Sequence, residues 1–246
     1  MSFNPLTPVT DYQSMLNRIF WFTTASSLAA IWTVRLFVPA LDDVFGKIDP
    51  ALRMDGAKAL PIAGSYLLPA LAIGMVTRVF RLHARVSDWL GIRETFDVEV
   101  ILAEFAHRLA IDLEPVGDDG LRRARHSVMR RAFYPYVSGP QPAIDQQLIH
   151  QALDAWSWFW VGVEATLVFV LTSFALIACH AYQIGFQLLA AATAVAILGL
   201  PALRTQCKRY AIAQVRAILA DPHRAATVRD AFADIAGEPA VRRRAA

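Results

Sequence analysis

WSWFWVGVEATLVFVL, residues Trp156 to Leu171, is the stretch that decides how this sequence is read. It belongs to an apolar run that continues to residue 178 and is long enough to cross a bilayer, for which about 20 apolar residues suffice. One acidic residue, Glu164, interrupts it. A charge in hydrocarbon is costly, so we expect Glu164 to face protein or water rather than lipid.

Three further apolar runs pass the same length test, so that the predicted spans are residues 19–41, 59–77, 156–178 and 182–203. The second contains Pro61 and Pro69, which membrane helices tolerate. The whole chain is 56% hydrophobic and 18% charged, against about 45–50% and about 25% in soluble domains. The sequence therefore predicts an all-α integral membrane protein with four transmembrane helices and a helical cytoplasmic domain.

Basic residues are distributed unevenly among the segments that connect these spans. Ten arginines lie within 78–155 and nine Lys or Arg follow residue 203, whereas the turn CHAYQ at 179–183 has none. Positively charged loops stay in the cytoplasm. We therefore expect a multi-pass protein of the bacterial inner membrane with both termini in the cytoplasm. Cys179 and Cys207 would then lie near opposite faces, out of reach of a disulfide.

These features divide the chain into four parts. Residues 1–77 would hold an N-terminal interfacial helix and the first two spans, and 78–155 a cytoplasmic helical insert. Residues 156–203 would form a transmembrane hairpin, and 204–246 basic cytoplasmic helices. The segment around residues 11–20 is either that interfacial helix or the start of one long helix. Thr95 is a predicted helix N-cap.

Arg35 is the second charge inside a predicted span, in IWTVRLFVPAL at residues 31–41. It either lines a pore and favours anions, or extends its side chain to the outer headgroups. Glu164 should differ from it in depth by about 10 Å, so a direct ion pair is not expected. Glu164 would be protonated, hydrogen-bonded to another helix, or facing water. The candidate pore-lining residues are Thr24, Ser27, Ile31, Arg35 and Glu164.

A strongly basic run, RRARHSVMRR, is predicted to form one short helix. Its arginines would bind either a phosphate-bearing ligand, such as a nucleotide or oligonucleotide, or anionic membrane lipid at about 1 kcal/mol per residue. The candidate ligand- or lipid-binding residues are Arg122, Arg123, Arg125, Arg130 and Arg131.

Catalytic, metal and cofactor motifs are missing from the sequence, so we predict no enzyme activity, no metal site and no cofactor. Glu104 and His107 have the spacing of half a di-iron site, but the further carboxylates that such a site needs are not found. A solvated helix face is the favoured interpretation.

Four spans, a helical insert and a basic tail resemble the small multi-pass effectors of bacterial anti-phage defence. The resemblance is architectural, covers the four predicted spans and the insert, and assigns no residue a role. It implies that a partner enzyme makes a nucleotide signal, to which the membrane protein responds by permeabilising or depolarising the inner membrane.

The predicted function is an anion-favouring, homo-oligomeric channel gated from the cytoplasm by a ligand or partner. Four helices are too few to enclose a hydrated path, so the pore would form between subunits. One alternative is a non-conducting membrane scaffold or sensor that recruits a cytoplasmic partner. A second is a small proton-coupled transporter that uses Glu164.

Overall fold

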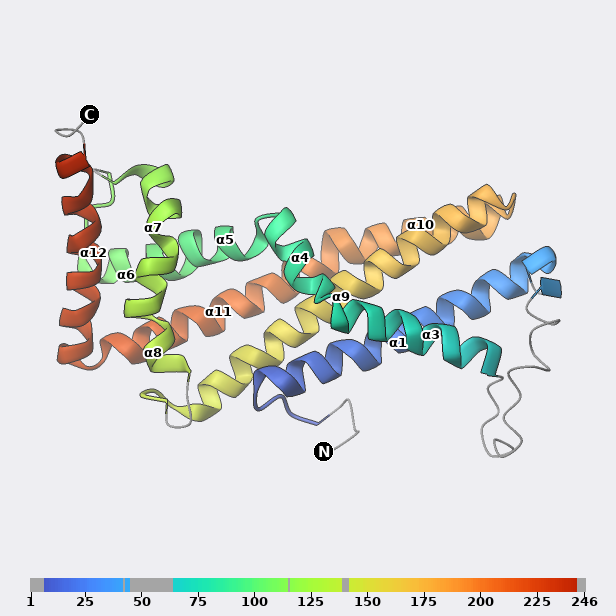
Figure 1. The fold of residues 1–246 in the computed structure, drawn as a ribbon, viewed down its shortest axis with the longest axis horizontal. Helices are drawn as coiled ribbons and strands as arrows, with labels where there is room; N and C mark the ends of the chain where they lie inside the picture. The colour runs from blue at the N-terminus through green and yellow to red at the C-terminus, as the bar shows by residue number, and fades with distance from the viewer. Residues whose placement is uncertain (1–6, 42, 45–63, 115, 139–141, 243–246) are drawn as a thin grey trace. The chain divides into compact units, whose positions relative to one another are not determined.

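The computed structural model describes residues 7–41, 43–44, 64–114, 116–138 and 142–242, with side chains as far as residue 235. Every regular element in these ranges is a helix, which confirms the all-α fold (Figure 1). The chain divides into two compact units. Unit 1 consists of Met1–His83 and Leu153–Arg204, and unit 2 of Ala84–Ala152 and Thr205–Ala246.

Helix α1 (Tyr12–Phe37) opens unit 1. Its start is fixed by a capping box, in which the Asp11 carboxylate accepts from the Ser14 amide and the Ser14 hydroxyl accepts from the Asp11 amide. Its end precedes Pro39, whose ring disfavours helix in the residue before it. Residues 12–20 are continuous with the rest of α1, and whether they lie at the membrane interface stays a prediction.

Helix α3 (Gly64–Val79) runs antiparallel to α1. It contains Pro69, while Pro61 lies outside the described residues. After it, Arg81 adopts a left-handed conformation with φ of 47°, and the axis bends by 56° into α4 (Leu82–Trp89). Helices α1 and α3 approach closely at Gly74 of α3, where a Cβ would lie 2.2 Å from Oγ1 of Thr24 on α1.

Helix α9 (Gln146–Ala178) includes the predicted third span and begins ten residues before it. It runs parallel to α1, because Arg18 contacts Asp154 and the later residue Thr23 contacts the later residue Glu164. The chain then reverses at His180 and returns as α10 (Tyr182–Ala194), the π-helix η2 (Val195–Gly199) and α11 (Leu200–Leu219). These three form one run of 38 residues, so residue 203 does not end a helix.

Three described helices are long and apolar enough to cross a membrane: α1, α9 and the run from α10 through α11. The bent pair of α3 and α4 makes a fourth candidate if it counts as one span. The described chain therefore has three to four candidate spans.

Unit 2 is built from both the predicted insert and the predicted tail. Its elements, besides parts of α4, α9 and α11, are α5 (Ile92–Phe96), the π-helix η1 (Asp97–Leu102), α6 (Ala103–Leu109), α7 (Gly117–Ala132), α8 (Tyr134–Val137) and α12 (Pro222–Arg242). Helix α12 packs against α6 and α7, and its buried Val228 and Phe232 belong to the same core as Phe105 and Met129. The two segments, which the sequence divides into separate parts, thus share one hydrophobic core.

Two helix boundaries in unit 2 lie at turns of the chain. Thr95 is not an N-cap: α5 begins three residues earlier, after Gly91, whose φ of 62° is a conformation that glycine adopts without strain. The turn at Gly91 therefore sets the helix start. Toward the other end of the chain, α11 ends at Leu219 and α12 begins at Pro222, a residue that is well tolerated at the first position of a helix.

Candidate functional site

Polar side chains buried inside unit 1 form the candidate site. They come from α1, α3 and α9, with one more at the start of α4. Those that are less than one-tenth exposed are Arg18, Thr23, Thr24, Ser27 and Arg35 of α1, Ser65 and Thr77 of α3, His83 of α4, and Ser157, Glu164, Thr172 and Ser173 of α9. Such residues are expensive in a membrane span and are a default indication of function.

Glu164 is buried between α9 and α1, with 3% of its surface exposed. The Thr23 hydroxyl donates to its Oε2 over 2.5 Å. Its other oxygen, Oε1, has no hydrogen-bond partner among the described residues. The hydroxyl of Ser27, which lies one helical turn after Thr23 on α1, also has no partner there. Of the three environments weighed for Glu164, the structure has a hydrogen bond to another helix.

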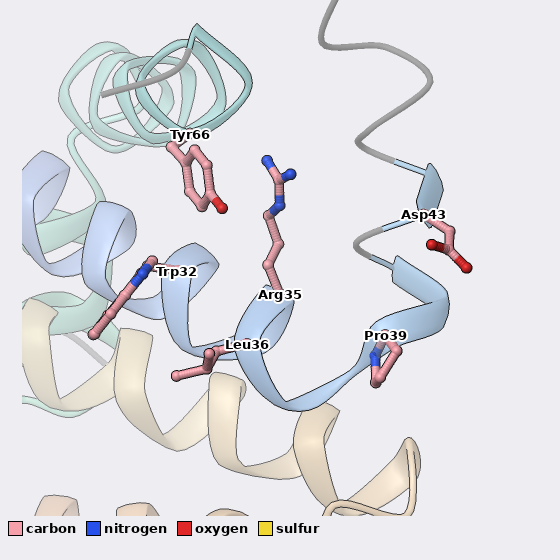
Figure 2. Close-up of a pocket in the computed structure, with 6 residues that line it drawn as sticks. All are labelled: Trp32, Arg35, Leu36, Pro39, Asp43 and Tyr66. Carbon is pink, nitrogen blue, oxygen red and sulfur yellow. The ribbon is translucent and has the colours of Figure 1, made fainter. Parts of the chain in front are cut away.

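Arg35 is also buried, with 7% of its surface exposed, in the last turn of α1. Its guanidinium donates to Ser65 Oγ over 2.7 Å and lies 4.0 Å from the centre of the Tyr66 ring. Figure 2 shows the side chain rising from α1 beside Tyr66, with Asp43 on its other side. A cavity of about 280 Å³ adjoins these residues, lined by Trp32, Arg35, Leu36, Pro39, Asp43 and Tyr66.

Arg35 and Glu164 have separate partners. Thr23, which binds Glu164, precedes Arg35 by 12 residues, or about 18 Å of helix. The remaining pore-lining candidates on α1 are placed differently: Thr24 is buried with its hydroxyl on the Phe20 carbonyl, and Ile31 is half-buried. The lining of a pore by these residues stays a prediction.

A third buried charge, Arg18, is absent from the sequence-derived site. Its guanidinium donates to the Asp154 carboxylate over 2.6 Å, to Ser157 Oγ over 2.7 Å and to the Thr7 carbonyl over 2.8 Å. It also lies 4.9 Å from the Trp158 ring. A signal existed in the sequence, because both Arg18 and Asp154 stand just before the predicted cytoplasmic ends of spans that run in the same direction.

The five arginines of α7 lie in unit 2, and three of them form ion pairs. Arg122 pairs with Glu94 at 3.1 Å, Arg125 with Asp97 at 3.5 Å, and Arg131 with Asp234. The other two, Arg123 and Arg130, are exposed on the helix, and Arg123 donates to a carbonyl of its own helix. Much of the positive charge of this run is therefore balanced by acidic side chains of the same unit.

Asp97 is the buried member of this group. It begins η1, and only 8% of its side chain is exposed beside Arg125. Burial raises the pKa of Asp97 to about 6, although the charges of Arg93 and Arg125 act to lower it.

Among the described residues, no group of three or more His, Cys, Asp or Glu side chains is placed to hold a metal ion. Glu104 instead accepts a hydrogen bond from Arg108 over 2.6 Å.

Comparison with known proteins finds one matching protein family. The model of the YmfE protein family matches residues 11–234, which include most of both units. No curated protein and no solved structure matches the chain. Since the match extends over far more than half of the sequence, the chain belongs to the YmfE protein family.

Proposed function

We propose that the chain is an integral protein of the bacterial inner membrane that crosses it four times and conducts small ions along the buried polar residues of α1. One observation carries this proposal. From Arg18 through Thr23 and Ser27 to Arg35, buried polar groups recur over 17 residues, or about 26 Å of helix. That length is close to the hydrocarbon thickness of about 30 Å.

The direction of the helices supports a cytoplasmic location for both termini and for unit 2. Because α1 and α9 are parallel and α3 is antiparallel to them, Arg18, Arg78 and Asp154 lie at one end of unit 1. That end also carries the arginine-rich connections of the chain. Positively charged connections remain on the cytoplasmic side.

Conduction would require movement, since the polar groups are packed between helices in the single chain. We propose that subunits assemble and that separation of α1 from α3 and α9 exposes these groups to water, with Arg35 favouring anions. Apolar surface that is half or more exposed could contact lipid or further subunits; it includes Phe186, Val195, Ile197 and Leu198. Unit 2 would control this change through a ligand or partner.

A proton-coupled transporter is the second candidate, and Glu164 favours it. A carboxyl group that is buried between two helices, with one oxygen bound by Thr23 and the other without a partner, could exchange a proton as the helices move. A non-conducting scaffold that recruits a cytoplasmic partner is the outcome if neither transport activity is found.

The architectural resemblance to anti-phage effectors suggests a setting for channel activity. We propose that opening depolarises the inner membrane in response to a nucleotide-derived signal. Expression of the chain together with such a signal should reduce the membrane potential, read with a potential-sensitive dye, and cells that keep their potential would contradict this role.

The purified full chain in planar bilayers with a KCl gradient tests the main proposal. Wild type should give single-channel steps and a reversal potential on the chloride side. Arg35→Ala should move that potential toward zero, whereas Arg35→Lys, which keeps the charge, should retain most of the preference. Arg123→Ala, in unit 2 and exposed, is the control for loss of a distant charge.

Glu164→Gln separates the two transport mechanisms, because the amide oxygen can still accept from Thr23 but cannot release a proton. A pore should stay open in this variant, while proton-coupled transport should lose its dependence on pH. Absence of current in wild type, with and without added nucleotides, would contradict the channel.

A further inference from the structure

Unit 2 contains a basic cavity that lies away from the arginine run predicted to bind ligand. Its volume is about 350 Å³, and its walls come from α6, α11 and the beginning of α12. The residues that line it are Arg108, Leu109, Arg216, Leu219, Ala220, Ala225 and Arg229.

Three arginines from three different helices meet at this cavity, Arg108 of α6, Arg216 of α11 and Arg229 of α12. Glu104 offsets part of their charge: its Oε1 lies 2.6 Å from Arg108 Nε and 4.0 Å from Arg216 Nε. Arg229 has no ion pair with any residue that the structure describes. The cavity thus keeps an excess of positive charge that a bound anion would compensate.

The helices that carry these arginines are held firmly by the core of unit 2. Val215, Ile218 and Val228, adjacent to Arg216 and Arg229 in the sequence, are fully buried. At the corner between α11 and α12, the Asp221 carboxylate accepts from the amides of the first residues of α12. The helices that carry the three arginines are therefore fixed in place before any ligand binds, which lowers the entropic cost of binding.

We propose that this cavity binds a phosphate group carried on a small molecule. Guanidinium forks match phosphate oxygens in geometry and charge, while Leu109 and Leu219 offer an apolar wall to the rest of the ligand. The volume is near the lower end of the roughly 300–1,000 Å³ of ligand sites. It suits a mononucleotide or a lipid headgroup better than an oligonucleotide.

This site differs from the arginines of α7, which are largely paired with acidic residues. A role of this cavity in gating rests on the proposed channel function, but ligand binding to the cavity does not. If the protein conducts current but binds neither probe, only the ligand site is overturned. If it binds a probe but conducts no current, only the channel function is contradicted.

Isothermal titration of the full chain in neutral detergent at low salt tests the site with two probes. AMP represents a free phosphate ligand, and dihexanoyl-phosphatidylglycerol represents a lipid headgroup. We expect saturable binding of at least one probe at one molecule per chain, and the probe that binds identifies the source of the phosphate. Arg229→Gln should weaken that binding about tenfold through loss of a charge-assisted contact.

Matched variants make the result specific. Arg209→Gln removes an exposed arginine of α11 in the same unit, outside the cavity, and should leave affinity unchanged. Glu104→Gln removes the competing anion and should tighten binding, which a purely structural role of Arg229 would not produce. Arg216→Gln provides a second loss variant, and circular dichroism checks that each variant is folded. Saturation by neither probe, or equal loss in Arg209→Gln and Arg229→Gln, would overturn the proposal.

Discussion

Each charged side chain buried in unit 1 is held by a polar group from another helix. Arg18 binds Asp154, Glu164 accepts from Thr23, and Arg35 donates to α3. A buried charge without such a partner would destabilise the fold by several kcal/mol. Helices α1, α3 and α9 must therefore pack in the register that gives each buried charge its partner. Polar residues therefore select the register of this bundle, while apolar residues supply most of the burial.

Asp97 in unit 2 makes stability depend on pH. Its folded-state pKa of about 6 lies above its ordinary value of 3.8, so the folded state binds the proton more tightly. The resulting stabilisation is present below about pH 4 and is lost as the pH rises through 6. Over this window the free energy of unfolding should fall by up to about 3 kcal/mol, since one pKa unit corresponds to 1.36 kcal/mol.

Asp97→Asn should remove this dependence. The measurement is the difference between wild type and variant in hydrogen exchange of the α5–η1 amides at each pH from 4 to 7, because other carboxyl groups cancel in that difference. The variant should show the smaller rise in local opening between pH 4 and pH 7. An equal rise in both proteins would contradict the assignment of the effect to Asp97.

At the scale of elements, glycines decide how closely the long apolar helices approach. Gly185 of α10 faces α9, where a Cβ would lie 2.7 Å from the Ile177 side chain and 3.2 Å from the Ser173 carbonyl oxygen. The backbone of α9 cannot yield without a shift of the whole helix. Small residues at such contacts allow the close packing on which membrane helix pairs depend.

Gly185→Ala should therefore destabilise the α9–α10 hairpin by about 1–3 kcal/mol, the usual cost of overpacking. Thermal unfolding in detergent measures this as a lower midpoint. Gly199→Ala, farther along the same helical run, is the matched control, because its Cβ would meet only Val195 Cγ1 at 3.6 Å. Equal midpoints for the two variants would show that the hairpin has room to adjust.

At the scale of the whole molecule, the proposed topology separates the two cysteines. Cys179 is exposed in the turn after α9, and Cys207 is buried in α11. A membrane-impermeant maleimide added to spheroplasts should label Cys179 from outside, and Cys179→Ser should abolish the signal. Labelling that appears only after the cells are opened would place this turn in the cytoplasm and contradict the proposed orientation.

The sequence by itself determined the class of fold and most of the helices. Apolar runs of sufficient length, with charges gathered between them, leave few alternatives to membrane-length helices, because unpaired backbone groups are too costly in hydrocarbon. It also pointed to Arg35 and Glu164, since an isolated charge in an apolar run is conspicuous.

Only the tertiary structure decided which residues meet. Thr23 becomes the partner of Glu164 because α1 and α9 pack in parallel, and the insert and the tail form one unit because α12 packs against α6 and α7. In the basic cavity, Arg108 is separated from Arg216 and Arg229 by more than 100 residues, and the three form no local pattern. Helical periodicity describes neighbours within one element, whereas contacts between elements depend on packing that the sequence does not display.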